Sequence, residues 1–177
     1  MDSGSQRVTF PSAAETLTGL LFTPPDPPAG RWPAVVIAGG QTCVKEQMAQ
    51  VYAERLAARG HAALAFDFRG FGESAGAPRD YESPAHKIED IHSALTFLAG
   101  QPVIDPGRLA VLGIGVGAGY VAAAAAENSR LRALALVAPG LQDHEIIQAR
   151  YGGAWPGLSG WPSTPSAPRP GSPRRPS

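Results

Sequence analysis

Four glycines at alternate positions stand where an apolar run meets an alanine-rich run, in residues 109–127, LAVLGIGVGAGYVAAAAAE. They are Gly113, Gly115, Gly117 and Gly119. The pattern predicts a strand, a tight turn and a helix. A turn of this kind can present either a nucleophile or a phosphate-binding helix N-terminus, and the two interpretations require different residues nearby.

The phosphate interpretation is weakly supported. Gly113, Gly115 and Ala118 satisfy the dinucleotide-binding pattern G-x-G-x-x-[GA]. Such a site also needs an acidic residue after the next strand, about 20 residues further on. The corresponding region, ALALVAPG, has no carboxylate before Asp143. A dinucleotide-binding module therefore stays only as a second alternative.

The nucleophile interpretation has more support. Residues 113–117, GIGVG, match the frame G-x-S-x-G of a nucleophile turn, with Gly115 at the position of the nucleophile. Further upstream, DFRGFGES at residues 67–74 follows another apolar run. Its glycines permit a tight loop, and we expect Asp67 and Arg69 to brace that loop.

Residues 5–150 resemble the N-terminal part of the α/β-hydrolase superfamily, in its dienelactone-hydrolase-like bacterial branch. The resemblance implies a doubly wound, mostly parallel sheet, an oxyanion hole, and a nucleophile–histidine–acid triad. It further implies hydrolysis of carboxylic esters, lactones or thioesters without a cofactor or a metal. The segments that carry it are VIAGGQTCVKEQ (36–47), DFRGFGES, KIEDIHSALTFL (87–98), DPGRLAVLGIGVGAGY (105–120) and LRALALVAP (131–139).

Two members of the implied triad lack a counterpart. Gly115 has no side chain, which excludes covalent catalysis from this position. The implied histidine follows the later strands, yet no histidine lies beyond His144. We therefore expect weak or no hydrolysis and leave open whether the chain is an enzyme. The alternative is a non-hydrolytic relative: a lyase, a cyclase or a protein that binds a carbonyl ligand.

The resemblance also implies an oxyanion hole built from backbone. Its donors would be the amide of Val116 and an amide of the loop after the predicted strand at 34–38, from Gly40 or Gln41. Backbone donors do not depend on side-chain identity and contribute strongly to catalysis of acyl transfer. A small acyl or ester ligand is thus the expected partner.

Three more residues are candidate accessories. Cys43 lies near the implied oxyanion loop, although a lone cysteine is more often an inert small hydrophobe. Asp143 and His144 follow the predicted strand at 131–139, at the edge where ligands bind in open α/β sheets. The start of a surface helix explains that pair equally simply.

Strands and helices alternate along the chain, which predicts a mostly parallel sheet with helices on both faces. Two antiparallel strands should lead into it. The predicted strands are 7–10, 17–22, 34–38, 62–68, 108–113 and 131–139, and the predicted helices are 45–59, 85–99 and 117–128.

Composition excludes several classes of partner. Fifteen basic and fifteen acidic residues cancel, which does not favour nucleic acid or an anionic membrane. No apolar run reaches the roughly 18 residues of a membrane span. The single cysteine favours a cytoplasmic protein.

The last segment, residues 152–177, has a different composition. It is rich in Pro, Gly and Ser and has no acidic residue, so we expect a disordered tail. We hypothesise that it is a frameshift product. The partial α/β-hydrolase domain would then be residues 1–151, truncated after the sixth strand. That strand should form an open sheet edge through which the chain can self-associate.

Overall fold

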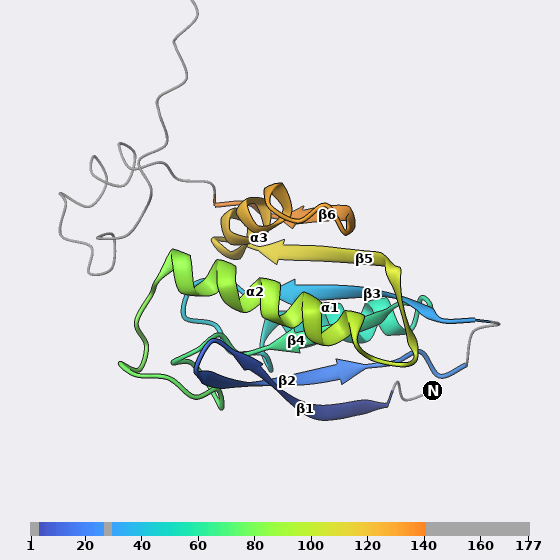
Figure 1. Cartoon of the computed structure of the whole chain (residues 1–177), viewed down its shortest axis with the longest axis horizontal. Coiled ribbons are helices and arrows are strands. Elements are labelled where there is room, and N and C mark those ends of the chain that lie inside the picture. Colours follow the sequence, from blue (N-terminus) through green and yellow to red (C-terminus); the bar gives the residue numbers. More distant parts are fainter. Residues whose placement is uncertain (1–3, 27–29, 141–177) are drawn as a thin grey trace, which may run out of the picture.

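The computed structural model describes residues 4–26 and 30–140. In this part of the chain, six strands form one sheet in the order β1-β2-β4-β3-β5-β6 (Figure 1). The strands are β1 (Ser5–Ser12), β2 (Glu15–Phe22), β3 (Trp32–Ala38), β4 (Ala62–Phe66), β5 (Ile104–Ile114) and β6 (Leu131–Val137), and the helices are α1 (Met48–Ala57), α2 (Pro84–Ala99) and α3 (Gly117–Ala126).

The sheet is parallel except at its N-terminal end. Strands β4, β3, β5 and β6 pair in parallel, whereas β1 pairs with β2, and β2 with β4, in antiparallel fashion. The predicted doubly wound, mostly parallel sheet with an antiparallel lead-in is confirmed. Because parallel strands end at the same edge, the loops after β3, β4, β5 and β6 gather there, and this edge positions the candidate site.

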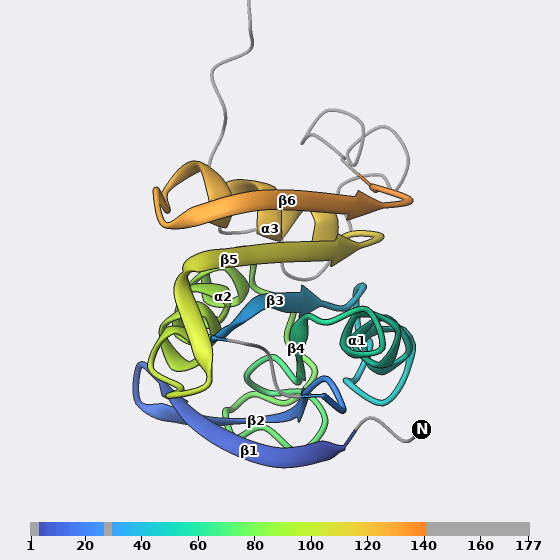
Figure 2. The same cartoon turned by 90° about the vertical axis from the view of Figure 1, so that its right-hand side faces the viewer.

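Helices cover both faces of the sheet. Figure 2 shows α1 on one side and α2 on the other, and α3 packs against α2. Helix α2 begins where Ser83 accepts a hydrogen bond from His86 N and Pro84 occupies the first turn. Its buried side chains, Ile91, Leu95 and Leu98, recur at helical spacing and face the core.

The start of α1 differs from the prediction. The pattern predicted a helix from residue 45, but α1 begins at Met48. The backbone N–H and the Nζ of Lys45 both donate to the Asp67 carboxylate, each at 2.7 Å. Because Lys45 is bound to Asp67 in this way, residues 45–47 lie before the helix and not in its first turn. The predicted stop is close: α1 ends at Ala57, and Gly60 follows with a φ of +85°.

Strand β6 lies at one end of the sheet order and pairs only with β5 among the described residues. Its side chains are largely exposed, including Leu134 at 44% and Leu136 at 37%. The predicted domain boundary at 151/152 and the predicted tail lie outside the described residues. Within those residues, no helix combines the length and apolar character needed to cross a bilayer.

Candidate functional site

The glycine turn joins β5 to α3 as the sequence predicts. Gly115 lies at its centre with a φ of +59°, and a Cβ built there would meet no atom of the described residues within 4 Å. Its N–H donates to Val137 O at 3.0 Å, and its carbonyl oxygen accepts from Gly140 N at 3.0 Å. The turn is therefore attached to the end of β6, and no described residue fills the space next to the Cα of Gly115.

The neighbouring glycines are required by close packing. A Cβ at Gly113 would overlap Val121 and Ala118, which belong to α3. A Cβ at Gly117 would overlap the carbonyl oxygen of Gly39, which directly follows β3. Small residues on both sides of position 115 thus let α3 start against two strand ends.

The loop after β3 reaches the same place. A Cβ at Gly40 would lie 3.4 Å from Cys43 Sγ and 3.7 Å from the carbonyl oxygen of Ile114, the last residue of β5. Gln41 and Cys43 are half-buried. The structure therefore brings Gly40 close to the end of β5 and places Cys43 beside Gly40. Asp143 and His144 lie outside the described residues.

Three backbone N–H groups at this edge have no acceptor among the described residues. No described residue accepts a hydrogen bond from the N–H of Val116, Gly40 or Gln41. Unpaired amides at a helix N-terminus and in an adjacent loop form an environment suited to an anionic or strongly polarised oxygen.

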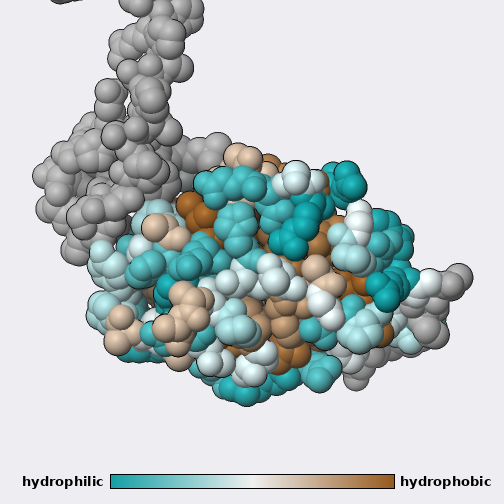
Figure 3. Space-filling model, in the orientation of Figure 1, coloured by the Kyte–Doolittle hydropathy of each residue, from teal (hydrophilic) through white to brown (hydrophobic). Residues whose placement is uncertain are grey.

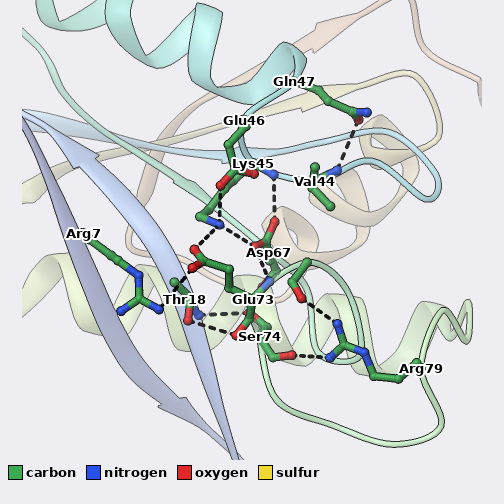
Figure 4. A network of polar contacts seen from close by, with 11 residues as sticks. Arg7, Thr18, Val44, Lys45, Glu46, Gln47, Asp67, Glu73, Ser74 and Arg79 are labelled. Atoms are coloured by element: carbon green, nitrogen blue, oxygen red, sulfur yellow. Dashed lines mark hydrogen bonds and ion pairs between the residues drawn. The ribbon is translucent and has the colours of Figure 1, made fainter.

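The loop after β4 is held by Asp67, as the sequence predicts. The Asp67 side chain is fully buried and accepts hydrogen bonds from Lys45 N at 2.7 Å, Lys45 Nζ at 2.7 Å and Glu73 N at 3.0 Å (Figure 4). A Cβ at Gly72 would overlap this carboxylate, which explains the second glycine of the motif. Ser74 Oγ donates to the carbonyl oxygen of Asp67 at 2.6 Å.

Arg69 braces the other side of that loop, which confirms the second half of the prediction. Its N–H donates to Asp90 Oδ2 at 2.9 Å and its Nε to Asp90 Oδ1 at 2.8 Å. Asp90 is fully buried on α2 and also accepts from Ser12 Oγ at 2.7 Å. This pair ties the loop to α2, whereas Asp67 ties it to the loop after β3.

Three carboxylates converge on Lys45. Its Nζ lies 2.6 Å from Glu46, 2.7 Å from Asp67 and 2.7 Å from Glu73, although the lysine side chain is only 1% exposed. Burial by itself would lower the pKa of Lys45, but the hydrogen bonds to these carboxylates outweigh it and raise the pKa above its ordinary value. The ammonium fills the position that a metal ion would take between the three carboxylates.

Sequence reasoning missed a second buried lysine. Lys87 Nζ pairs with Glu82 at 2.7 and 2.9 Å and lies 4.6 and 4.5 Å from the ring centroids of Phe68 and Phe71. Burial lowers the pKa of Lys87, while the Glu82 charge acts in the opposite direction. One signal was available: Lys87 stands four residues before Ile91, on the apolar stripe of α2.

A separate groove lies between β1 and α2. Figure 3 shows the face that carries α2, which is largely hydrophilic, with apolar residues between α2 and the β1–β2 hairpin. None of the groove's lining residues belongs to the loops after β3 or β5, so it is distinct from the candidate site. They are Pro11, Glu89, His92, Ser93, Thr96, Phe97, Gly100 and Gln101.

Comparison with known proteins adds the family. The sequence model of the family described as "Serine aminopeptidase, S33" matches residues 32–165. A thiohydrolase of Eupenicillium brefeldianum is 36% identical over 124 residues, which cover 70% of this chain and 39% of that protein. The chain spans less than half the length of its curated relatives, between 34% and 43% for those compared.

Solved structures of other proteins have a similar fold. The crystal structure of the hypothetical protein PA2218 from Pseudomonas aeruginosa matches with a TM-score of 0.73 and 36% identity, over 76% of this chain and 42% of that one. A dienelactone hydrolase-like promiscuous phosphotriesterase from metagenomic libraries matches with a TM-score of 0.68 over 83% of this chain and 64% of that one. At 23% identity, the second likeness concerns the fold alone. The resemblance that the sequence motifs indicated is confirmed.

Proposed function

Because this chain belongs to the serine aminopeptidase family of α/β-hydrolases, we propose that it provides the acyl-binding core of that fold while its own hydrolytic activity is weak or absent. The substrate class of the core is a carboxylic ester, lactone or thioester. The relative named as a thiohydrolase supports the thioester member of this class, because a thioester is the member that contains sulfur. The chain spans 39% of that relative, so the activity is proposed here for the core alone.

The observation that carries the proposal is the backbone at Gly115. Its φ of +59° and the open space at the absent Cβ suit a residue whose side chain would project from a sharp strand-to-helix turn. A glycine there supplies no oxygen or sulfur to attack a carbonyl carbon. The acyl-enzyme step is therefore closed at this position.

Binding of a carbonyl ligand without turnover is a second candidate function. The amides of Val116, Gly40 and Gln41 support it, since none of them has an acceptor in the part of the chain that the structure describes. Preorganised donors polarise a carbonyl whether or not a nucleophile is present. We place this function in the cytoplasm, in keeping with the free thiol of Cys43.

The test introduces a nucleophile where the backbone leaves room. All variants carry C43S, so that G115C supplies the single thiol of the chain. A thiol at the start of α3 should have a lowered pKa and react without a histidine partner. The matched control is G60C, because Gly60 also has a positive φ, +85°, and no atom within 4 Å of a Cβ.

We expect the unmodified chain to hydrolyse p-nitrophenyl acetate no faster than buffer and to show no acyl adduct by mass spectrometry. The G115C variant should acquire an acetyl group faster than G60C does. Turnover by the unmodified chain with an acetylated protein intermediate would overturn the proposal. If the two thiols are acetylated at equal rates after correction for their general reactivity, the proposal of a carbonyl-binding site at Gly115 is wrong.

A further inference from the structure

The structure assigns a positioning role to the buried pair Lys45–Asp67. We propose that this pair holds the loop after β3 so that the amides of Gly40 and Gln41 stay beside the glycine turn. The inference rests on the proposed function, because it concerns the same carbonyl site. Neither side chain needs to touch the ligand.

The loop at 39–47 has hydrogen bonds of ordinary length within its second half, from Gln47 N to Val44 O at 3.1 Å and from Val44 N to Gln47 Oε1 at 3.2 Å. On its Gly40 side, the backbone contact from Cys43 N to Gly40 O is long, at 3.4 Å. Lys45 instead makes two contacts of 2.7 Å to Asp67, one from its backbone N–H and one from Nζ. Lys45 is thus the residue of the loop whose short contacts tie it to Asp67.

Asp67 is itself fixed to the sheet. It directly follows β4, and its N–H donates to Thr18 O of β2 at 2.9 Å. Its carboxylate also accepts from Glu73 N at 3.0 Å, in the space left by the missing Cβ of Gly72. Lys45 therefore binds to a group whose place is determined by β2 and β4.

Among the three carboxylates that contact Lys45, only that of Asp67 is shielded from water, so its attraction to the ammonium is not screened by solvent. Glu46 and Glu73 also contact Lys45 Nζ, but they are 51% and 50% exposed, whereas Asp67 is fully buried. Exposed ion pairs contribute little, while a buried ion that loses its partner is strongly destabilised. Without the Asp67 charge, the ammonium has only exposed partners and should move toward solvent with its loop.

The experiment compares two reactions of the thiol introduced by G115C in the C43S background. Acetylation by p-nitrophenyl acetate develops an oxyanion that the loop amides can stabilise. Disulfide exchange with bis(2-hydroxyethyl) disulfide releases a thiolate, so the charge develops on sulfur and not on oxygen, and its rate reports access to the thiol and the pKa of the thiol. The ratio of the two rates, compared with the same ratio for G60C, isolates the contribution of the amides.

D67N keeps an acceptor for Lys45 N but removes the charge that binds Nζ. We expect it to lower the rate ratio of G115C by about tenfold or more, because loss of one oxyanion donor costs on the order of 100- to 1000-fold. The disulfide-exchange rate should not change. D90N is the matched control, since Asp90 is equally buried and paired with a cation but ties the loop after β4 to α2. It should leave the ratio unchanged.

The outcomes separate the two proposals. If the ratio for G115C is no larger than for G60C, the proposed carbonyl site is wrong. If it is larger and D67N leaves it intact, or if D90N lowers it equally, the positioning role alone is wrong. Should circular dichroism show that D67N is unfolded, K45M/D67N removes both charges together, which is less costly than leaving one unpaired. The same loss in the ratio is then expected.

Discussion

The Cβ atom that Gly117 lacks would overlap the carbonyl oxygen of Gly39, so helix α3 begins in direct contact with the end of β3. The overlapping atom belongs to the backbone and cannot rotate away. The spacing between the α3 N-terminus and the loop after β3 therefore depends on the absence of one methyl group.

We expect Gly117→Ala to lower the free energy of unfolding by about 1–3 kcal/mol, the cost of overpacking. The sign of this change in the free energy of unfolding is informative, because alanine favours a helix more than glycine does and would stabilise α3 if the close contact were absent. Urea unfolding measures the effect. Gly30→Ala is the control, since a Cβ there meets nothing within 4 Å, and it should stay close to the parent. A neutral or stabilising Gly117→Ala would contradict the close contact.

Gly72 and Gly60 form a second comparison, because both have a positive φ, +49° and +85°. Alanine in this backbone region costs about 1–2 kcal/mol at either position. At Gly72 the new Cβ would also overlap the Asp67 carboxylate, whereas at Gly60 it meets nothing. We expect Gly72→Ala to be more destabilising than Gly60→Ala by about 1–3 kcal/mol in urea unfolding. Equal losses would show that Asp67 can move aside at no cost.

Lys87 predicts a dependence of stability on alkaline pH. Burial lowers its pKa in the folded chain below 10.5. Between the lowered pKa and 10.5 the unfolded chain holds more protons, so the free energy of unfolding gains a contribution that rises with pH. Lys87→Met removes this contribution. The free energy of unfolding of the parent minus that of Lys87→Met should increase as pH rises toward 10.5.

The other titrating groups, including Lys45, are common to both proteins and cancel in that difference to first order. Urea unfolding at several pH values from neutral upward provides the measurement. A difference that stays constant or falls over this range would show that the buried ammonium is not disfavoured.

The open edge of β6 predicts self-association. Leu134 is central in the strand and 44% exposed, and no described strand pairs beyond β6. Edge strands with unpaired backbone groups and apolar side chains tend to pair with one another. We expect the sedimentation mass of the chain to rise with concentration and Leu134→Lys to suppress the rise. Val103→Lys changes a similarly exposed residue, 46%, away from β6 and should have no effect. The edge is not the interface if the two variants behave alike.

The sequence was sufficient for the sheet because buried parallel strands are continuous apolar runs, as in β3 and β4. It misplaced the start of α1 because the contact that decides it joins Lys45 to Asp67, 22 residues away. Lys87 was missed although its place on the apolar stripe of α2 was a local signal, because the rings of Phe68 and Phe71 beside its ammonium come from another part of the chain. Local sequence patterns predict helices and strands, but they do not show which charged side chains meet between distant segments of the chain.

The open, left-handed backbone at Gly115 has an evolutionary consequence. A glycine codon of the form GGC becomes a serine codon, AGC, or a cysteine codon, TGC, by one base change. Neither side chain would meet an atom of the described residues within 4 Å of its Cβ, so the cost is limited to about 1–2 kcal/mol for the positive φ. The φ of +59° already fits the turn. With a codon of that form, the position is a single mutational step from presenting a nucleophile, and the described backbone around it would need no rebuilding.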